Sequence, residues 1–242
     1  MFSRVISAAV YGIDAYIVNV ETDVGFGLPT FDMSGALGSK VREAKDRVRV
    51  AIKNSGIELT PQKIVINISP ANIRKEGTIY DLPIAIGILA ANGCFDLKIL
   101  ENVLIIGEVS LDGSINPVKG VLPMVCAAKE AGIDNCIIPK ANIAEGRIIN
   151  NINIYGVETL SQTIEILKNI AVIDGSRKNI KQADVKSGEC NKSDGNINND
   201  TYNVLERSRV KFTYGSEVKN NNHSCSYNID YSDISGQEAA KR

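Results

Sequence analysis

The stretch that decides the fold is KEGTIYDLPIAIGILAANG, residues 75–93. From Leu82 to Ala91 every residue is apolar or glycine. Ten residues are too few for a membrane span, which needs about 20, so the run predicts a buried helix. Asp81 stands just before it, and its carboxylate can accept a free backbone N–H of the first turn. We therefore expect Asp81 to be the N-cap of a helix that ends at Asn92-Gly93.

A second informative block, GEVSLDGSINPVKG, covers residues 107–120. Strands are expected over Val103–Ser110 and Ser114–Val118, on either side of Asp112-Gly113. This pair favours a two-residue hairpin turn. A helix is expected to follow from about Val121 to Ala131, where Gly132 stops it.

These two blocks, together with Ser3-Arg4-Val5 and Gly12-Ile13-Asp14, resemble the N-terminal domain of magnesium-chelatase-like AAA+ ATPases of the YifB/ComM family. The resemblance covers residues 1–170. It implies the fold of ribosomal protein S5 domain 2 and of the Lon protease domain, which is an α/β (α+β) sandwich with a mixed sheet. The last residues, 230–242, look like the start of that family's AAA+ ATPase domain. The chain would then be truncated before the Walker A motif.

Short apolar segments elsewhere in residues 1–170 alternate between the periods of strands and helices. Strands are expected at Tyr16–Val24, Thr30–Met33, Lys63–Ser69, Asn135–Pro139 and Ile152–Tyr155, and helices at Ser39–Asn54 and Leu160–Asn169. After Ile170, Asn, Ser, Lys, Asp and Gly dominate. Such a composition does not bury enough apolar surface to offset chain entropy, so 171–229 is predicted to be a disordered linker. The alternative is a domain with weak signals.

Overall charge gives no reason to expect a particular partner. The formal net charge is −1 for 242 residues, and residues 1–170 carry 16 Lys and Arg against 18 Asp and Glu. A nucleic-acid site must therefore be local. The start lacks the apolar core of a signal peptide, so we expect a cytoplasmic protein with no membrane partner. Five scattered cysteines without a C-x-x-C pair indicate reduced thiols, with Cys94, Cys126 and Cys136 as small buried hydrophobes.

Catalytic chemistry is not predicted in these residues. The single histidine, His223, lies in the polar tail, so no Ser-His-Asp site can form. The resemblance to Lon implies a Ser-Lys dyad, but Leu82 stands at the serine position and Leu122 at the lysine position. A residual peptidase would need a shifted register that brings Ser110 or Ser114 near Lys119.

Phosphate and metal sites are not predicted either. GALGSK, residues 35–40, follows a strand and opens a helix, but two residues rather than four separate its glycines, and Ser39 splits Gly38 from Lys40. The carboxylates are spread along the chain without a ligand spacing. We therefore expect no catalytic, cofactor or metal residues here, and ATP and Mg²⁺ only in the full-length protein.

A basic helix face is the candidate binding site. Arg42, Lys45, Arg49 and Lys53 follow steps of three, four and four, which places them on one face of the expected helix. Such a stripe can lie along a nucleic-acid backbone. Glu43, Asp46 and Arg47 lie alongside, and an ordinary solvated face explains the pattern as well.

The resemblance implies a function for the whole protein. Members of the family are ring-forming, hexameric ATPases, and ComM-type members act on DNA in branch migration during transformation. The 242 residues would then be a non-catalytic accessory domain that binds DNA. The alternatives are a scaffold for ring assembly and a residual Lon-like peptidase.

Overall fold

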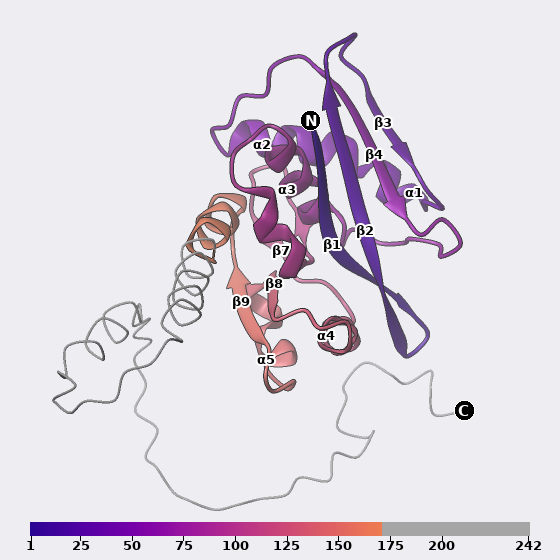
Figure 1. Ribbon diagram of the computed structural model, residues 1–242, viewed down its shortest axis with the longest axis vertical. Coiled ribbons are helices and arrows are strands. Elements are labelled where there is room, and N and C mark those ends of the chain that lie inside the picture. Colours follow the sequence, from indigo (N-terminus) through magenta and orange to yellow (C-terminus); the bar gives the residue numbers. More distant parts are fainter. Residues whose placement is uncertain (171–242) are drawn as a thin grey trace, which may run out of the picture. The chain divides into compact units, whose positions relative to one another are not determined.

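The computed structural model describes residues 1–170, which form the domain shown in colour in Figure 1. The predicted linker at 171–229 and the predicted start of an ATPase domain at 230–242 lie outside these residues. His223, Cys190 and Cys225 lie outside them as well.

One sheet of seven strands organises the described residues. Across the sheet these are β3 (Phe31–Ser34), β4 (Lys63–Ser69), β2 (Asp14–Gly25), β1 (Phe2–Tyr11), β5 (Val103–Ile105), β8 (Asn135–Pro139) and β9 (Asn153–Val157). β1 and β2 form a long antiparallel hairpin, and β2 also pairs antiparallel with β4. The other four pairings are parallel. The predicted mixed sheet is confirmed.

Helices cover both faces of this sheet (Figure 1). The α-helices are α1 (Ser39–Arg42), α2 (Ala44–Asn54), α3 (Asp81–Ala91), α4 (Val121–Glu130) and α5 (Ile143–Gly146), and the 3₁₀ turns are η1 (Leu97–Asn102) and η2 (Lys140–Asn142). Residues 160–170 are also helical. None of the helices within residues 1–170 has the length and apolar character needed to cross a membrane.

Side chains that alternate along the strands point to opposite faces of the sheet and so form two separate hydrophobic cores. Val103 and Ile105 of β5 join the core under α2 and α3, while Leu104 between them joins the core under α4. The same split occurs in β8, where Ile137 faces the first core and Cys136 the second. Period-two alternation in buried strands thus produces a helix layer on each side.

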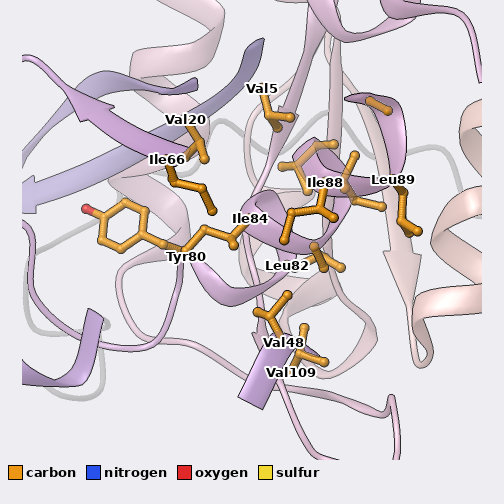
Figure 2. Close-up of a cluster of buried hydrophobic side chains, with 14 of the residues drawn as sticks. Val5, Val20, Val48, Ile66, Tyr80, Leu82, Ile84, Ile88, Leu89 and Val109 are labelled. Atoms are coloured by element: carbon orange, nitrogen blue, oxygen red, sulfur yellow. The ribbon is translucent and has the colours of Figure 1, made fainter. Parts of the chain in front are cut away.

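α3 lies at the centre of the first core, and every one of its residues is buried. Figure 2 shows Leu82, Ile84 and Ile88 of this helix among buried side chains of other elements. Their neighbours come from four segments: Val5 (β1), Val20 (β2), Ile66 (β4) and Val48 (α2). The uniformly apolar run quoted first is therefore a core helix, as its composition predicts.

A small hairpin connects distant parts of the domain. β6 (Glu108–Val109) pairs with β7 (Ile115–Asn116), and Ser110 N–H donates to Ser114 O at 2.9 Å. The loop therefore holds three residues, 111–113, and the predicted two-residue turn is wrong. Gly113 has a φ of 85°, which suits the αL residue of a three-residue hairpin loop.

The hairpin loop is anchored on both sides. Asn54 Nδ2 at the end of α2 donates to Leu111 O at 2.7 Å, and Leu160 N–H donates to Gly113 O at 2.9 Å. A Cβ on Gly113 would lie 2.4 Å from Ser55 Oγ. Glycine is therefore required here both by the backbone conformation and by the close approach of α2.

Candidate nucleic-acid interface

The predicted helix over Ser39–Asn54 is broken at Glu43. Glu43 ends α1 and also serves as the N-cap residue of α2, so the segment is two helices in series. The buried residues of α2 are Ala44, Val48, Ala51 and Ile52, which lie at helical spacing and pack toward α3. The opposite face of α2 is left to solvent.

The four candidate residues are all exposed. Arg42 is the last residue of α1, and Lys45, Arg49 and Lys53 lie on the solvent side of α2. Between Lys40 and Lys53 the chain carries six basic and two acidic residues. Among the ion pairs formed within residues 1–170, none includes any of the four. Their charges are thus available to a ligand.

Arg47, on the same helix, has a different role. Its Nε donates to Asp81 Oδ2 at 2.8 Å, and its Nη2 donates to Asp81 Oδ1 at 2.9 Å and to Lys40 O at 2.9 Å. Asp81 has no exposed surface. The bidentate pair joins α2 to α3 and removes Arg47 from the solvent-facing set.

The predicted role of Asp81 is therefore wrong. Tyr80 is the N-cap residue and Asp81 the first residue of α3, where its carboxylate accepts from Arg47 and from the Val109 backbone. Burial raises the pKa of Asp81, and the hydrogen bonds from Arg47 oppose that rise. The hydrogen bond to Asp81 raises the pKa of Arg47 in turn. A buried carboxylate needs such a partner, and a cap at the surface does not.

A polar cluster lies beside this pair and includes both serines that a residual peptidase would need. Thr78 Oγ1 donates to Glu108, and Asn116 Nδ2 donates to Glu108 Oε1 at 3.2 Å and to Ser110 Oγ at 2.9 Å. Ser114 Oγ donates to an Asp112 oxygen at 2.7 Å. The two serines thus bond to amide and carboxylate groups. Lys119, the base that a residual peptidase would need, is exposed.

The two positions of the Lon dyad are occupied by structural leucines. Leu82 is fully buried in α3, and its N–H donates to Gly107 O at 3.0 Å. Leu122 is half-buried in α4, and its N–H donates to Glu145 Oε1 at 2.9 Å. Neither side chain can act as a nucleophile or a base.

The GALGSK loop is a packed connection. Gly35 has a φ of 117°, and a Cβ there would lie 2.7 Å from Ile68 O. Gly38 N–H donates to Lys75 O at 2.8 Å, and Lys75 N–H donates to Ala36 O at 2.8 Å. The backbone groups of Ala36 and Gly38 are therefore hydrogen-bonded to Lys75, which lies in the segment before α3.

Cysteines are the remaining candidates for reactive side chains in residues 1–170. Cys136 is buried, and its burial raises the pKa of the thiol to about 12. Cys94 and Cys126 are partly exposed, so the expectation that both are buried is wrong. Within the same residues no group of three or more His, Cys, Asp or Glu is arranged to hold a metal ion.

A pocket at one end of α2 is the feature that the sequence did not predict. Its volume is about 330 Å³, and Arg49 and Lys53 lie among its lining residues. The remaining lining residues are Pro29, Thr30, Phe31, Ile57, Glu58, Leu59, Thr60, Pro61, Gln62, Ile64 and Ile88. The whole lining comes from three stretches of the chain, residues 29–31, 49–64 and 88, so no local pattern could have revealed the pocket.

The fold defines a Lon-like domain, in which leucines stand at the two positions where the resemblance implies the Ser-Lys dyad. An archaeal Lon protease of Thermococcus kodakarensis is 31% identical over 151 residues, which are 60% of this chain and 23% of that protein. Lon protease 2 of Bacillus subtilis is 32% identical over 133 residues, or 54% of this chain and 24% of that protein.

The chain belongs to the family of subunit ChlI of Mg-chelatase, whose sequence profile matches residues 20–142. The competence protein ComM of Haemophilus influenzae is 36% identical over 163 residues, and YifB of Escherichia coli is 40% identical over 148. These regions make up 67% and 61% of this chain, but only 32% and 29% of the relatives. The chain thus spans about a third of their length. The predicted family is confirmed.

Proposed function

We propose that residues 1–170 are a non-catalytic DNA-binding domain that serves a DNA-processing ATPase of the ChlI-related YifB/ComM type. The observation that carries the proposal is the exposed, unpaired set Arg42, Lys45, Arg49 and Lys53, which we call the basic face. The family resemblance, which includes a competence protein, supports DNA as the partner. Branch migration, as implied for ComM-type members, is the activity we expect of the longer protein.

The basic face suits a phosphate backbone for a physical reason. Lys45, Arg49 and Lys53 recur at steps of four, so successive cations lie about 6 Å apart along α2. The stretch that carries the basic face has two acidic residues. The carboxylate of Glu43 lies 3.8 Å from Arg47 Nη1, and Asp46 is exposed and forms no ion pair within residues 1–170. Six basic residues from Lys40 to Lys53 leave this stretch with a net positive charge. Binding would release counterions from the DNA, which makes the affinity depend on salt.

The test is a titration of labelled DNA with the 242-residue protein between about 50 and 200 mM salt. Four phosphate contacts should give a slope of log K against log salt of about −3 to −4. The variant Arg42→Glu/Lys45→Glu/Arg49→Glu/Lys53→Glu should lose binding, while Lys129→Glu, an exposed lysine of α4, serves as the matched control. Equal binding by both variants, or none by the wild type at about 50 mM salt, would refute the proposal.

The other requirements of the longer protein are part of the same proposal. ATP and Mg²⁺ would be used outside residues 1–170, and we expect the full-length protein to assemble as a hexameric ring in the cytoplasm. Mass photometry of the full-length protein with and without ATP would test the ring. A monomer under both conditions would contradict it.

A scaffold is the second candidate function, because large apolar side chains are exposed at the two ends of β2. Tyr11 at the end of β1 and Ile13 in the turn that follows are 71% and 61% exposed, and Phe26 and Leu28 after β2 are 105% and 83% exposed. Exposed apolar groups of this size often mark protein interfaces. If scaffolding is the function, light scattering should show self-association without DNA, and Tyr11→Ser/Ile13→Ser should weaken it.

A further inference from the structure

We infer that the pocket at the end of α2 holds an unstacked base of single-stranded DNA while the basic face carries the adjoining phosphates. This inference rests on the proposed DNA-binding function and specifies its ligand. The pocket and the basic face share two residues, Arg49 and Lys53. A strand that follows the cations along α2 would therefore reach the pocket without a gap.

The walls of the pocket suit the flat face of a base. Its volume of about 330 Å³ lies at the lower end of the range for small-molecule sites. Phe31, Ile57 and Leu59 line it as half-buried side chains, and the buried residues Ile64 and Ile88 also contribute. Bases bind single-strand proteins chiefly through stacking on aromatic and apolar groups.

Polar groups are also available for the edge of a base. The side chains of Thr30, Glu58, Thr60 and Gln62 line the same pocket. Thr30 Oγ1 donates to Asp32 at 3.2 Å and Gln62 Nε2 donates to Asn92 Oδ1 at 2.9 Å, so both also have partners within the protein. Hydrogen bonds to a base edge would accompany stacking, as in other single-strand sites.

Charge and geometry favour single-stranded DNA over the other candidate ligands. Arg49 and Lys53 outnumber the one acidic lining residue, Glu58, so the lining favours an anionic ligand. A duplex keeps its bases stacked and cannot place one in a pocket without the cost of unstacking it. A single strand presents its bases freely.

The decisive comparison changes the DNA and leaves the protein intact. The 242-residue protein is titrated with labelled oligothymidine of about 12 nucleotides and with an abasic strand of the same length and charge. We expect the oligothymidine to bind about tenfold more tightly than the abasic strand, a factor that corresponds to the stacking of one base. It should also bind more tightly than the duplex of the same length.

A pocket variant then locates the effect. Leu59→Asn keeps every charge of the basic face but removes an apolar wall, so the preference for oligothymidine over the abasic strand should fall to about one. Leu111→Asn changes an exposed leucine that is not part of the pocket lining and should leave the preference unchanged. Photocrosslinking of a 4-thiothymine oligonucleotide to the wild-type protein should label Phe31 or Leu59 and does not depend on any variant folding.

The outcomes separate this inference from the proposed function. Equal, salt-dependent binding of oligothymidine, abasic strand and duplex would overturn the inference and leave the basic face as a backbone-binding site. Crosslinks confined to residues outside the pocket would overturn it too. The absence of any DNA binding at low salt would overturn both proposals and leave the pocket to a ligand other than DNA.

Discussion

α2 and α3 are packed against each other and have the same length of eleven residues, but they differ in almost every other respect. α3 is buried over its whole length, whereas α2 buries only Ala44, Val48, Ala51 and Ile52. α3 contains the position at which Lon carries its serine, and in this chain that position is the core residue Leu82. α2 carries the exposed charges. In this domain the helix at which the resemblance places the Lon serine is a core helix, and the neighbouring helix presents charged side chains to solvent.

The ion pair between the helices is the most direct way to break this arrangement. Arg47→Ala leaves the Asp81 carboxylate buried without its partner, so we expect a loss of about 3 kcal/mol or more in the free energy of unfolding. Urea denaturation followed by circular dichroism measures it. The matched control is Arg49→Ala, two residues away on the solvent side, which should change stability by less than about 0.5 kcal/mol.

The double variant Arg47→Met/Asp81→Leu sharpens the interpretation. Removing both charges removes the unpaired carboxylate as well, so most of the lost stability should return. A loss as large as that of Arg47→Ala would mean that the pair stabilises the contact by itself, and that an unpaired buried charge is not the cause.

A substitution at Gly87 tests how closely α3 approaches the sheet. A Cβ at this position would lie 2.6 Å from Thr22 Oγ1, and Ser3 Oγ donates to Gly87 O at 2.7 Å. We expect Gly87→Ala to cost about 1–2 kcal/mol in spite of the better helix propensity of alanine. Thermal unfolding measures the change. Gly25→Ala is the control, because a Cβ added there would have no neighbour within 4 Å.

The predicted cost of Gly87→Ala comes from the clash with the Thr22 hydroxyl, and a substitution at Thr22 removes that hydroxyl. It is buried without a hydrogen-bond partner within the described residues. In a Thr22→Ala background, Gly87→Ala should therefore cost much less. An unchanged cost would place the clash elsewhere, with Val5 Cγ2 at 3.6 Å as the next nearest side chain.

The backbone of Lys75, in the segment before α3, is bonded to the loop before α1, and the Lys75 ammonium makes stability depend on pH. The side chain is buried, and its ammonium donates to Pro70 O. It forms no ion pair within residues 1–170, and burial lowers the pKa of the ammonium group. Between this lowered pKa and the unfolded value of about 10.4, the unfolded chain binds more protons than the folded one. Stability relative to Lys75→Met should therefore rise as pH rises through that window.

Urea titrations at about pH 8 and pH 10 test this prediction. The control Lys129→Met changes an exposed lysine, and its stability difference from the wild type should stay constant with pH. A fall in the stability of the wild type relative to Lys75→Met as pH rises would show that the fold stabilises the charged form instead.

The smallest expected effect concerns the basic face itself. Alanine at Arg42, Lys45, Arg49 or Lys53 should change the free energy of unfolding by no more than about 0.5 kcal/mol each, because none of them forms an ion pair within the described residues. Urea denaturation of the four variants measures it. A loss above about 1 kcal/mol at any position would indicate a structural role and weaken the contrast between the two helices.

The sequence predicts elements well where one period dominates. β4 and β8 begin and end at the predicted residues, and α3 ends one residue before the expected Asn92. β1 is not predicted as a strand, because the small polar residues Ser3 and Ser7 occupy buried positions and weaken the apolar alternation. The break at Glu43 also leaves no signal, since its neighbours keep the helical spacing on both sides.

The sequence predicts the basic residues of the candidate site but not the ion pair or the pocket beside them. Helical spacing selects the four basic residues, but it cannot distinguish Arg47, whose partner Asp81 lies 34 residues away. The pairing depends on how α2 packs on α3, which is a tertiary property. The pocket has the same character, because residues 29–31, 49–64 and 88 meet only in the folded domain.

The anchored β6–β7 loop has a mechanical consequence. Leu160, at the start of the final described helix, is bonded to Gly113, and two residues away on the same loop Leu111 is bonded to Asn54 at the end of α2. Tension applied to the chain at residue 170 would thus pass through this short loop to the helix that carries the basic face. In a longer protein, movement of whatever follows the domain would therefore act both on β9, which ends three residues before Leu160, and on α2, the helix that carries the basic face.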